Sequence, residues 1–153
     1  MKTRKSWRDK LADSKDLPKT LLIPAPREVD EMMARVPPGK VATINEIRAA
    51  LARKHNTTMT CPLTTGIFAW IAAHAAEEAA AAGRTDITPY WRTLKVDGQL
   101  NAKYPGGVAA QKKRLVAEGH AIVKKGQKSF VADYGKVLCD FTTLSGRRTR
   151  AGA

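Results

Sequence analysis

The chain has 153 residues, which suits one domain with a single hydrophobic core. It carries 27 lysines and arginines against 14 acidic residues, and the net charge of +13 favours a polyanionic partner. Its two cysteines, Cys61 and Cys139, exclude a disulfide framework and belong to no zinc-binding motif, so we expect neither a metal nor another cofactor.

Residues 1–25 predict a basic N-terminal arm. Pro18 and Pro24 interrupt it, so the arm is either a disordered tail or contains one short helix from Trp7 to Ala12. The arm lacks the apolar run of a signal peptide, and the chain lacks a run long enough to span a membrane. We therefore expect a cytoplasmic protein, associated with the nucleoid, that has no membrane partner.

Two helices are predicted next. Pro26 suits the first position of a helix, and a buried stripe follows at Val29, Met32, Met33 and Val36. The sequence Pro37-Pro38-Gly39 ends that helix. Thr43 and Glu46 fit a capping box at the start of the second helix, in which the threonine hydroxyl accepts from the third helical amide and the glutamate reaches back.

Pro62 begins a longer helix, which we expect to bury one face made of Leu63, Ile67, Trp70 and Ile71. Its second half is rich in alanine, and Gly83 ends it. A polar connection from His55 to Thr60 precedes it. A short helix, a connection and a second helix follow the plan of a helix-turn-helix, whose second helix faces DNA, although helical hairpins without a DNA role share this plan.

The last part of the chain predicts mixed structure. Residues 93–100 suggest a small hairpin with an Asp-Gly turn. A helix from Val108 to Glu118 follows, and alternating segments around Lys125-Gly126-Gln127 suggest a second hairpin, placed like a wing. We therefore expect a mainly α fold with minor β, a winged helix-turn-helix domain over residues 26–142, and a flexible basic tail over residues 143–153.

Several segments, in this order, resemble one known family. The sequence from Val36 to Ile47 is similar to the start of the helix-turn-helix in the alkylguanine-DNA alkyltransferases. Their active-site half is similar to three segments here, Pro89-Tyr90-Trp91-Arg92, Tyr104-Pro105-Gly106-Gly107 and Glu118-Gly119-His120. In that family a Pro-Cys-His-Arg motif supplies an acceptor thiolate. Relatives without the cysteine, the alkyltransferase-like proteins, bind alkylated guanine in DNA and pass the lesion to nucleotide excision repair.

The resemblance implies a role for each matched residue. Tyr90 takes the position of the acceptor, and Trp91 replaces the histidine that deprotonates the thiol together with a water and a glutamate, near which Glu118 falls. A phenol with a pKa near 10 is protonated at neutral pH and is a poor nucleophile. The resemblance therefore implies a protein that is not an enzyme and that has a lesion pocket made of Tyr90, Trp91, Arg92, Tyr104, Pro105, Gly106 and Gly107.

Alternatives remain open for this pocket. Tyr90 and Trp91 either stack on an extruded base, which is worth about 1–3 kcal/mol per base, or fill the vacated pocket and stabilise the fold. Arg92 either braces the loop or contacts DNA. The family's helix usually inserts an arginine where the nucleotide leaves the stack, and here Thr65 is nearest that place, while Ile44 replaces a tyrosine. These departures favour a second reading, a DNA-binding regulator or nucleoid-type protein without lesion recognition.

The expected partner is double-stranded DNA, alkylated or not, bound by a monomer, and the resemblance implies nucleotide excision repair proteins as further partners. The side chains expected to contact DNA lie on the helix-turn-helix, the following loop, the basic helix and the wing. They are Asn45, Arg48, Thr64, Thr65, Gly66, Lys95, Lys103, Lys112, Lys113, Arg114, Lys124 and Lys125.

Cys61 supplies an enzymatic alternative. It sits beside Pro62 at a helix start, where the positive end of the helix dipole lowers the pKa of a thiol. Cys61 could then accept an alkyl group in place of the missing cysteine, although the sequence places no histidine to activate it.

Overall fold

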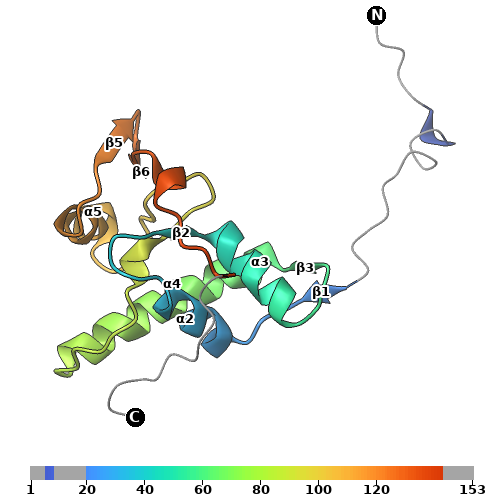
Figure 1. The fold of residues 1–153 in the computed structure, drawn as a ribbon, viewed down its shortest axis with the longest axis horizontal. Coiled ribbons are helices and arrows are strands. Elements are labelled where there is room, and N and C mark those ends of the chain that lie inside the picture. Colours follow the sequence, from blue (N-terminus) through green and yellow to red (C-terminus); the bar gives the residue numbers. More distant parts are fainter. Residues whose placement is uncertain (1–5, 9–19, 143–153) are drawn as a thin grey trace, which may run out of the picture.

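The computed structural model describes residues 6–8 and 20–142, and four helices of nine residues or more form its main body (Figure 1). Each helix begins within one residue of its predicted start. Their bounds are Pro26–Ala34 for α2, Ile44–Lys54 for α3, Pro62–Ala81 for α4 and Gly107–Ala117 for α5. Residues 7 and 8 are helical, but the rest of the helix predicted up to Ala12, and the predicted tail over residues 143–153, lie outside the described residues.

The core forms where α2 packs on α4. Val29 and Met33 of α2 are buried against the alanines of α4, chiefly Ala69, Ala73 and Ala76. The prediction that Leu63, Ile67, Trp70 and Ile71 form the buried face of this helix is wrong, because all four are exposed. Short alanine side chains let the two helices approach closely, so packing selected the small residues for the inner face and left the large ones outside.

Three two-stranded sheets complete the fold. β1 (Leu21–Leu22) pairs in parallel with β3 (Met59–Thr60), and β2 (Ala42–Thr43) pairs in parallel with β4 (Thr93–Leu94). β5 (Ile122–Lys125) and β6 (Lys128–Val131) form the antiparallel hairpin predicted as the wing. Figure 1 shows α5 and this hairpin at the opposite end of the molecule from β1 and β3.

The hairpin predicted over residues 93–100 is present only around its turn. The Gly98 amide donates to the Lys95 carbonyl at 3.0 Å, and the Lys95 amide donates to the Gln99 carbonyl at 2.9 Å. The residues before the turn, however, pair with β2, and Gln99 also forms a bridge with Phe130 of β6. The segment therefore links the helix-turn-helix to the wing.

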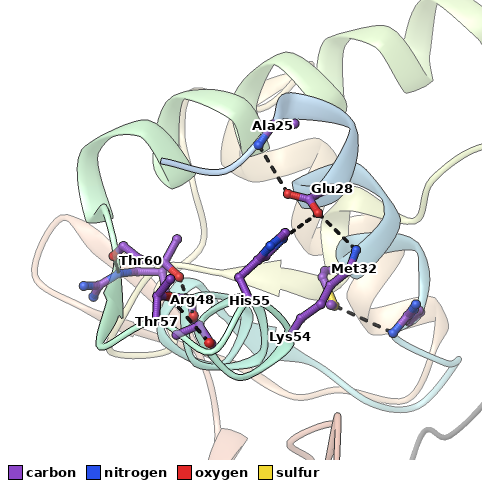
Figure 2. Close-up of polar contacts among 10 residues, drawn as sticks. Ala25, Glu28, Met32, Arg48, Lys54, His55, Thr57 and Thr60 are labelled. Atoms are coloured by element: carbon purple, nitrogen blue, oxygen red, sulfur yellow. Dashed lines mark hydrogen bonds and ion pairs between the residues drawn. The ribbon is translucent and has the colours of Figure 1, made fainter. Parts of the chain in front are cut away.

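Polar contacts fix how α3 lies between α2 and β3 (Figure 2). Nζ of Lys54 forms an ion pair with the Glu28 carboxylate of α2 at 3.1 Å, and Nε2 of His55 lies 2.7 Å from the same carboxylate. From the other side of α3, Nε of Arg48 donates to the Thr60 carbonyl at 2.9 Å. The predicted capping box between Thr43 and Glu46 is also present. Together α3 and α4 form the predicted helix-turn-helix.

We expect Gly98→Ala to destabilise the fold by about 2–4 kcal/mol, because Gly98 has a φ of +83° and an added Cβ would overlap the Tyr134 ring. Gly83→Ala is the matched control, since Gly83 has a φ of +91° and open space where a Cβ would lie. This variant should lose only about 1 kcal/mol of unfolding free energy. Urea unfolding of both variants measures the difference, and equal losses would contradict the packing argument.

Candidate nucleic-acid interface

A short 3-10 helix, η1 (Tyr90–Arg92), carries the first three residues of the predicted lesion pocket. The Tyr90 side chain points inward and only 1% of its surface is exposed. Its hydroxyl donates a hydrogen bond to Oε1 of Glu77 on α4 at 2.6 Å. Its ring meets the buried ring of Tyr104 edge-on, with centroids 5.4 Å apart. The structure therefore brings these two tyrosine rings of the predicted pocket into contact.

This environment keeps the Tyr90 phenol protonated. Burial raises the pKa of Tyr90, and the hydrogen bond to the Glu77 carboxylate raises it further. Burial also raises the pKa of Tyr104 beside it. A phenol that holds its proton so firmly cannot attack an alkyl carbon at neutral pH.

Trp91 and Arg92 share one carboxylate. Nε1 of Trp91 donates to Glu118 at 3.1 Å, and Nη2 of Arg92 donates to the same carboxylate at 2.6 Å. Nη1 of Arg92 also donates to the Val36 carbonyl at 2.8 Å, which ties η1 to the end of the α2 segment. These bonds occupy the Arg92 guanidinium and favour its role as a brace over a contact with DNA. Glu118 thus orients the Trp91 indole.

The rings of Tyr90, Trp91 and Tyr104 contact one another through Tyr90, and we call these three residues the aromatic cluster. Arg114 of α5 also points toward this cluster. Its Nη2 donates to Glu77 at 2.8 Å, and its guanidinium lies 4.4 Å from the centroid of the Trp91 ring. Arg114 was predicted to face DNA, whereas the structure pairs it with Glu77 and Trp91.

The sequence did not predict two residues that contact this cluster, Glu77 and Gln111. Glu77 and its neighbour Glu78 are the only acids in an alanine-rich run, which is the one signal that could have singled Glu77 out. Gln111 of α5 is buried, donates to the Trp91 carbonyl at 3.1 Å and accepts from the Asn101 amide at 2.7 Å. Gln111 therefore joins η1, the loop and α5, although nothing in its local sequence marks it.

The predicted glycine turn leads into α5. Gly106 caps the helix with a φ of +76°, and an added Cβ would meet the Cβ of Ala110. Gly107 also has a positive φ, and Pro105 is half-buried beside it. The turn needs glycine for its backbone geometry, and it brings Tyr104 against Tyr90.

An open hollow of about 440 Å³ lies between α3, the start of α4 and the loop after β4. Arg48 and Lys95 supply positive charge at its wall, and Ile44 and Val96 supply apolar surface. Its volume is in the range of ligand pockets, about 300–1,000 Å³. The full lining consists of Ile44, Arg48, Pro62, Gly66, Lys95, Val96, Asp97, Gln99 and Asn101.

The helix-turn-helix candidates divide into accessible and buried residues. Asn45 is exposed and accepts a hydrogen bond from Arg48 at 3.1 Å, and Gly66 has open space where a Cβ would lie. Thr64 is half-buried. The expectation that Thr65 faces DNA is wrong, because Thr65 is fully buried and its hydroxyl donates to the Cys61 carbonyl at 2.7 Å. Thr65 lies one turn before the buried Ala69, on the inner face of α4.

The remaining predicted lysines are exposed but dispersed. Lys103 lies on the loop before α5, Lys112 and Lys113 lie on α5, and Lys124 and Lys125 lie on β5. The loop after β4, which carries Lys95, adjoins the hairpin through the bridge between Gln99 and Phe130. None of these five lysines lines the hollow that contains Arg48 and Lys95. Figure 1 shows α5 and the hairpin at the far end of the molecule from β3.

Cys61 lies far from the aromatic cluster. It caps the start of α4, sixteen positions before Glu77, which is roughly 24 Å along the helix at ~1.5 Å per residue. A hydrogen bond with the Thr64 side chain, followed by one from the Thr64 amide, lowers the pKa of the Cys61 thiol. The thiol is thus more readily ionised than an ordinary one, but it lies far along α4 from the hydrogen bond between Glu77 and Tyr90.

Within residues 6–8 and 20–142, no helix has the length and apolar character needed to cross a membrane. In the same residues, no three or more His, Cys, Asp or Glu side chains are placed to hold a metal ion.

Two solved structures share the fold of this chain. One is S. pombe Atl1 in complex with damaged DNA containing O6-carboxymethylguanine, at 21% sequence identity and a TM-score of 0.54. The other is S. pombe ATL in complex with DNA, at 22% identity and a TM-score of 0.54. Each match covers 75% of this chain and 94% of the other chain. No protein-family model and no curated protein matches the sequence. The chain therefore has the fold of a DNA-bound alkyltransferase-like protein.

We expect the Glu118 carboxylate to stabilise the fold only while it is ionised. Burial alone would raise its pKa, but the bonds from Arg92 and Trp91 outweigh burial and lower the pKa below its usual 4.5. At neutral pH, Glu118→Gln should therefore destabilise the protein by about 1–2 kcal/mol. The difference from wild type should shrink as the pH falls below 4.5 and the wild-type carboxyl takes up a proton.

Urea unfolding at several pH values measures this difference. Glu78→Gln, at an exposed position on α4, serves as the control and should change stability little at any pH. If the unfolding free energies of wild type and Glu118→Gln differ by the same amount from pH 7 to pH 3, this result would contradict a stabilising ion pair.

Proposed function

We propose that the chain is a non-enzymatic DNA-binding protein of the alkyltransferase-like kind, which recognises alkylated guanine and marks it for repair. The observation that carries the proposal is the burial of the Tyr90 phenol and its hydrogen bond to Glu77. The sequence resemblance gives Tyr90 the position of the acceptor. A DNA-binding scaffold with this residue can hold a lesion but has no thiolate there to accept the alkyl group.

Three further observations support binding to DNA. The net charge of +13 suits a polyanion. The described fold contains a helix-turn-helix, and the two similar S. pombe structures are complexes with DNA, one of which contains O6-carboxymethylguanine. The hollow between α3, the start of α4 and the loop after β4 offers apolar surface for a base, and its two cations, Arg48 and Lys95, outnumber its one acid, Asp97. The handover to nucleotide excision repair proteins rests on the sequence resemblance alone.

The distance of Cys61 from Tyr90 separates this thiol from the position that the resemblance gives to the acceptor. Cys61 nevertheless precedes Pro62, which lines the hollow, so alkyl transfer to Cys61 would take place at the hollow. A second function, DNA binding without lesion recognition, is favoured by one observation. The rings of Tyr90 and Tyr104 are both buried, so they occupy space that an extruded base could otherwise enter. In that case the protein would act as a DNA-binding regulator or nucleoid-type protein.

A duplex with one O6-alkylguanine separates the two functions when it is compared with the same duplex carrying guanine. Lesion recognition predicts binding to the alkylated duplex that is tighter by about tenfold, or about 1.4 kcal/mol. Fluorescence anisotropy at a stated salt concentration gives both affinities. Equal affinities would leave only the lesion-independent function.

The cations at the hollow should contribute phosphate contacts. We expect Lys95→Gln to weaken binding to every duplex alike and to reduce the slope of log K against log salt by about 0.9. Lys136→Gln is the control, since exposed Lys136 lies on η2 (Tyr134–Lys136), outside the hollow. A slope that changes in the control but not in Lys95→Gln would place the DNA elsewhere.

A further inference from the structure

α4 carries its large apolar side chains on the outside. Leu63, Ile67 and Trp70 are exposed by 71%, 41% and 42%. Their spacing of four and three residues aligns them along one face of the helix. We call these three residues the outer stripe. Aligned apolar side chains of this size on a soluble domain commonly mark a binding surface.

Positive charge flanks the first half of the outer stripe. The stripe begins in the first turn of α4, where the helix dipole is positive. Pro62 and Gly66 precede Leu63 and Ile67 in the chain, and both line the hollow that also contains Arg48 and Lys95.

A third cation lies near the other end of the stripe. The Trp70 ring packs edge-on against His74, with centroids 5.5 Å apart. Nε2 of His74 lies 3.1 Å from the Lys103 carbonyl, so the loop that carries the exposed Lys103 side chain adjoins the stripe. An apolar line between cations suits a polyanion that also offers apolar surface.

DNA is such a polyanion, because its stacked bases lie between its phosphates. Proteins that bind the minor groove often insert Leu, Ile or similar side chains between base steps and unstack them. We infer that Ile67, with Leu63 beside it, is a wedge that enters the base stack when α4 lies on DNA. Gly66 has open space at its Cβ position, so the helix backbone can approach the groove there. The inference rests on the proposed function and names the side chains that open the duplex.

The same helix supplies a matched control. Ile71 is exposed by 47%, and it is the same residue type one turn after Ile67. Ile71, however, lines a separate groove between α4 and α2, together with Phe68 and Ala75. A wedge at Ile67 therefore predicts that Ile67→Ala and Ile71→Ala differ in DNA affinity and in base unstacking. A general loss of apolar surface predicts the same effect on DNA for both variants.

The experiment uses the full chain and a duplex that carries 2-aminopurine, whose fluorescence rises when its base unstacks. Anisotropy of a second dye on the same duplex reports binding. Wild type should bind and raise the 2-aminopurine signal. Ile67→Ala should lose most of that rise and bind roughly tenfold more weakly, with an unchanged salt slope. Leu63→Ala should show a partial loss, and Ile71→Ala should match wild type. Alanine keeps the helix, since it is the best helix former.

Each contrary outcome has a distinct meaning. Wild-type binding without any rise at a series of 2-aminopurine positions would overturn the wedge and leave the proposed function intact. An undiminished rise with Ile67→Ala would also overturn it, and a change in the sedimentation of the free protein in that variant would then assign the stripe to self-association. Absence of binding by wild type would remove the proposed function and the wedge with it.

Discussion

The hydrogen bond from the Tyr90 phenol to the Glu77 carboxylate holds the centre of the structure together. The same carboxylate pairs with Arg114 of α5, whose guanidinium covers the Trp91 ring. One acid thus links η1, α4 and α5. Burial and this bond both raise the pKa of the phenol, so the contact that stabilises the cluster also makes Tyr90 a poor nucleophile.

The second constraint is the division of α4 into two faces. Alanines on its inner face let α2 pack closely, and of the larger apolar residues of α4 Phe68 packs partly against the core. Leu63 and Ile67 remain on the surface, at the end of the helix that lies beside Arg48 and Lys95. Glu28, which contacts Lys54 and His55, holds α3 against α2 and so fixes the helix-turn-helix as a unit. The helix can thereby present an apolar line to a partner without weakening its packing.

Local sequence signals predicted where the helices begin. Pro26 and Pro62 begin helices, and Thr43 with Glu46 caps one, because these effects act within a single turn. The sequence did not predict the inner face of α4 because apolar residues, mainly alanine, occur on every side of that helix. Hydrophobic periodicity therefore does not single out the buried face, which tertiary packing determines. The motif order brought the Tyr90 and Tyr104 segments together correctly. It could not supply Glu77 or Gln111, which reach the cluster from distant elements.

The central claim is that the protein holds alkylated DNA and transfers nothing. The most direct test uses a duplex in which the alkyl group of an O6-alkylguanine carries a radioactive label. The label is located before and after the complex is denatured. The account predicts that the label migrates with the native complex and returns entirely to the DNA after denaturation. Label that stays on the denatured protein, or that never migrates with the protein, would contradict it.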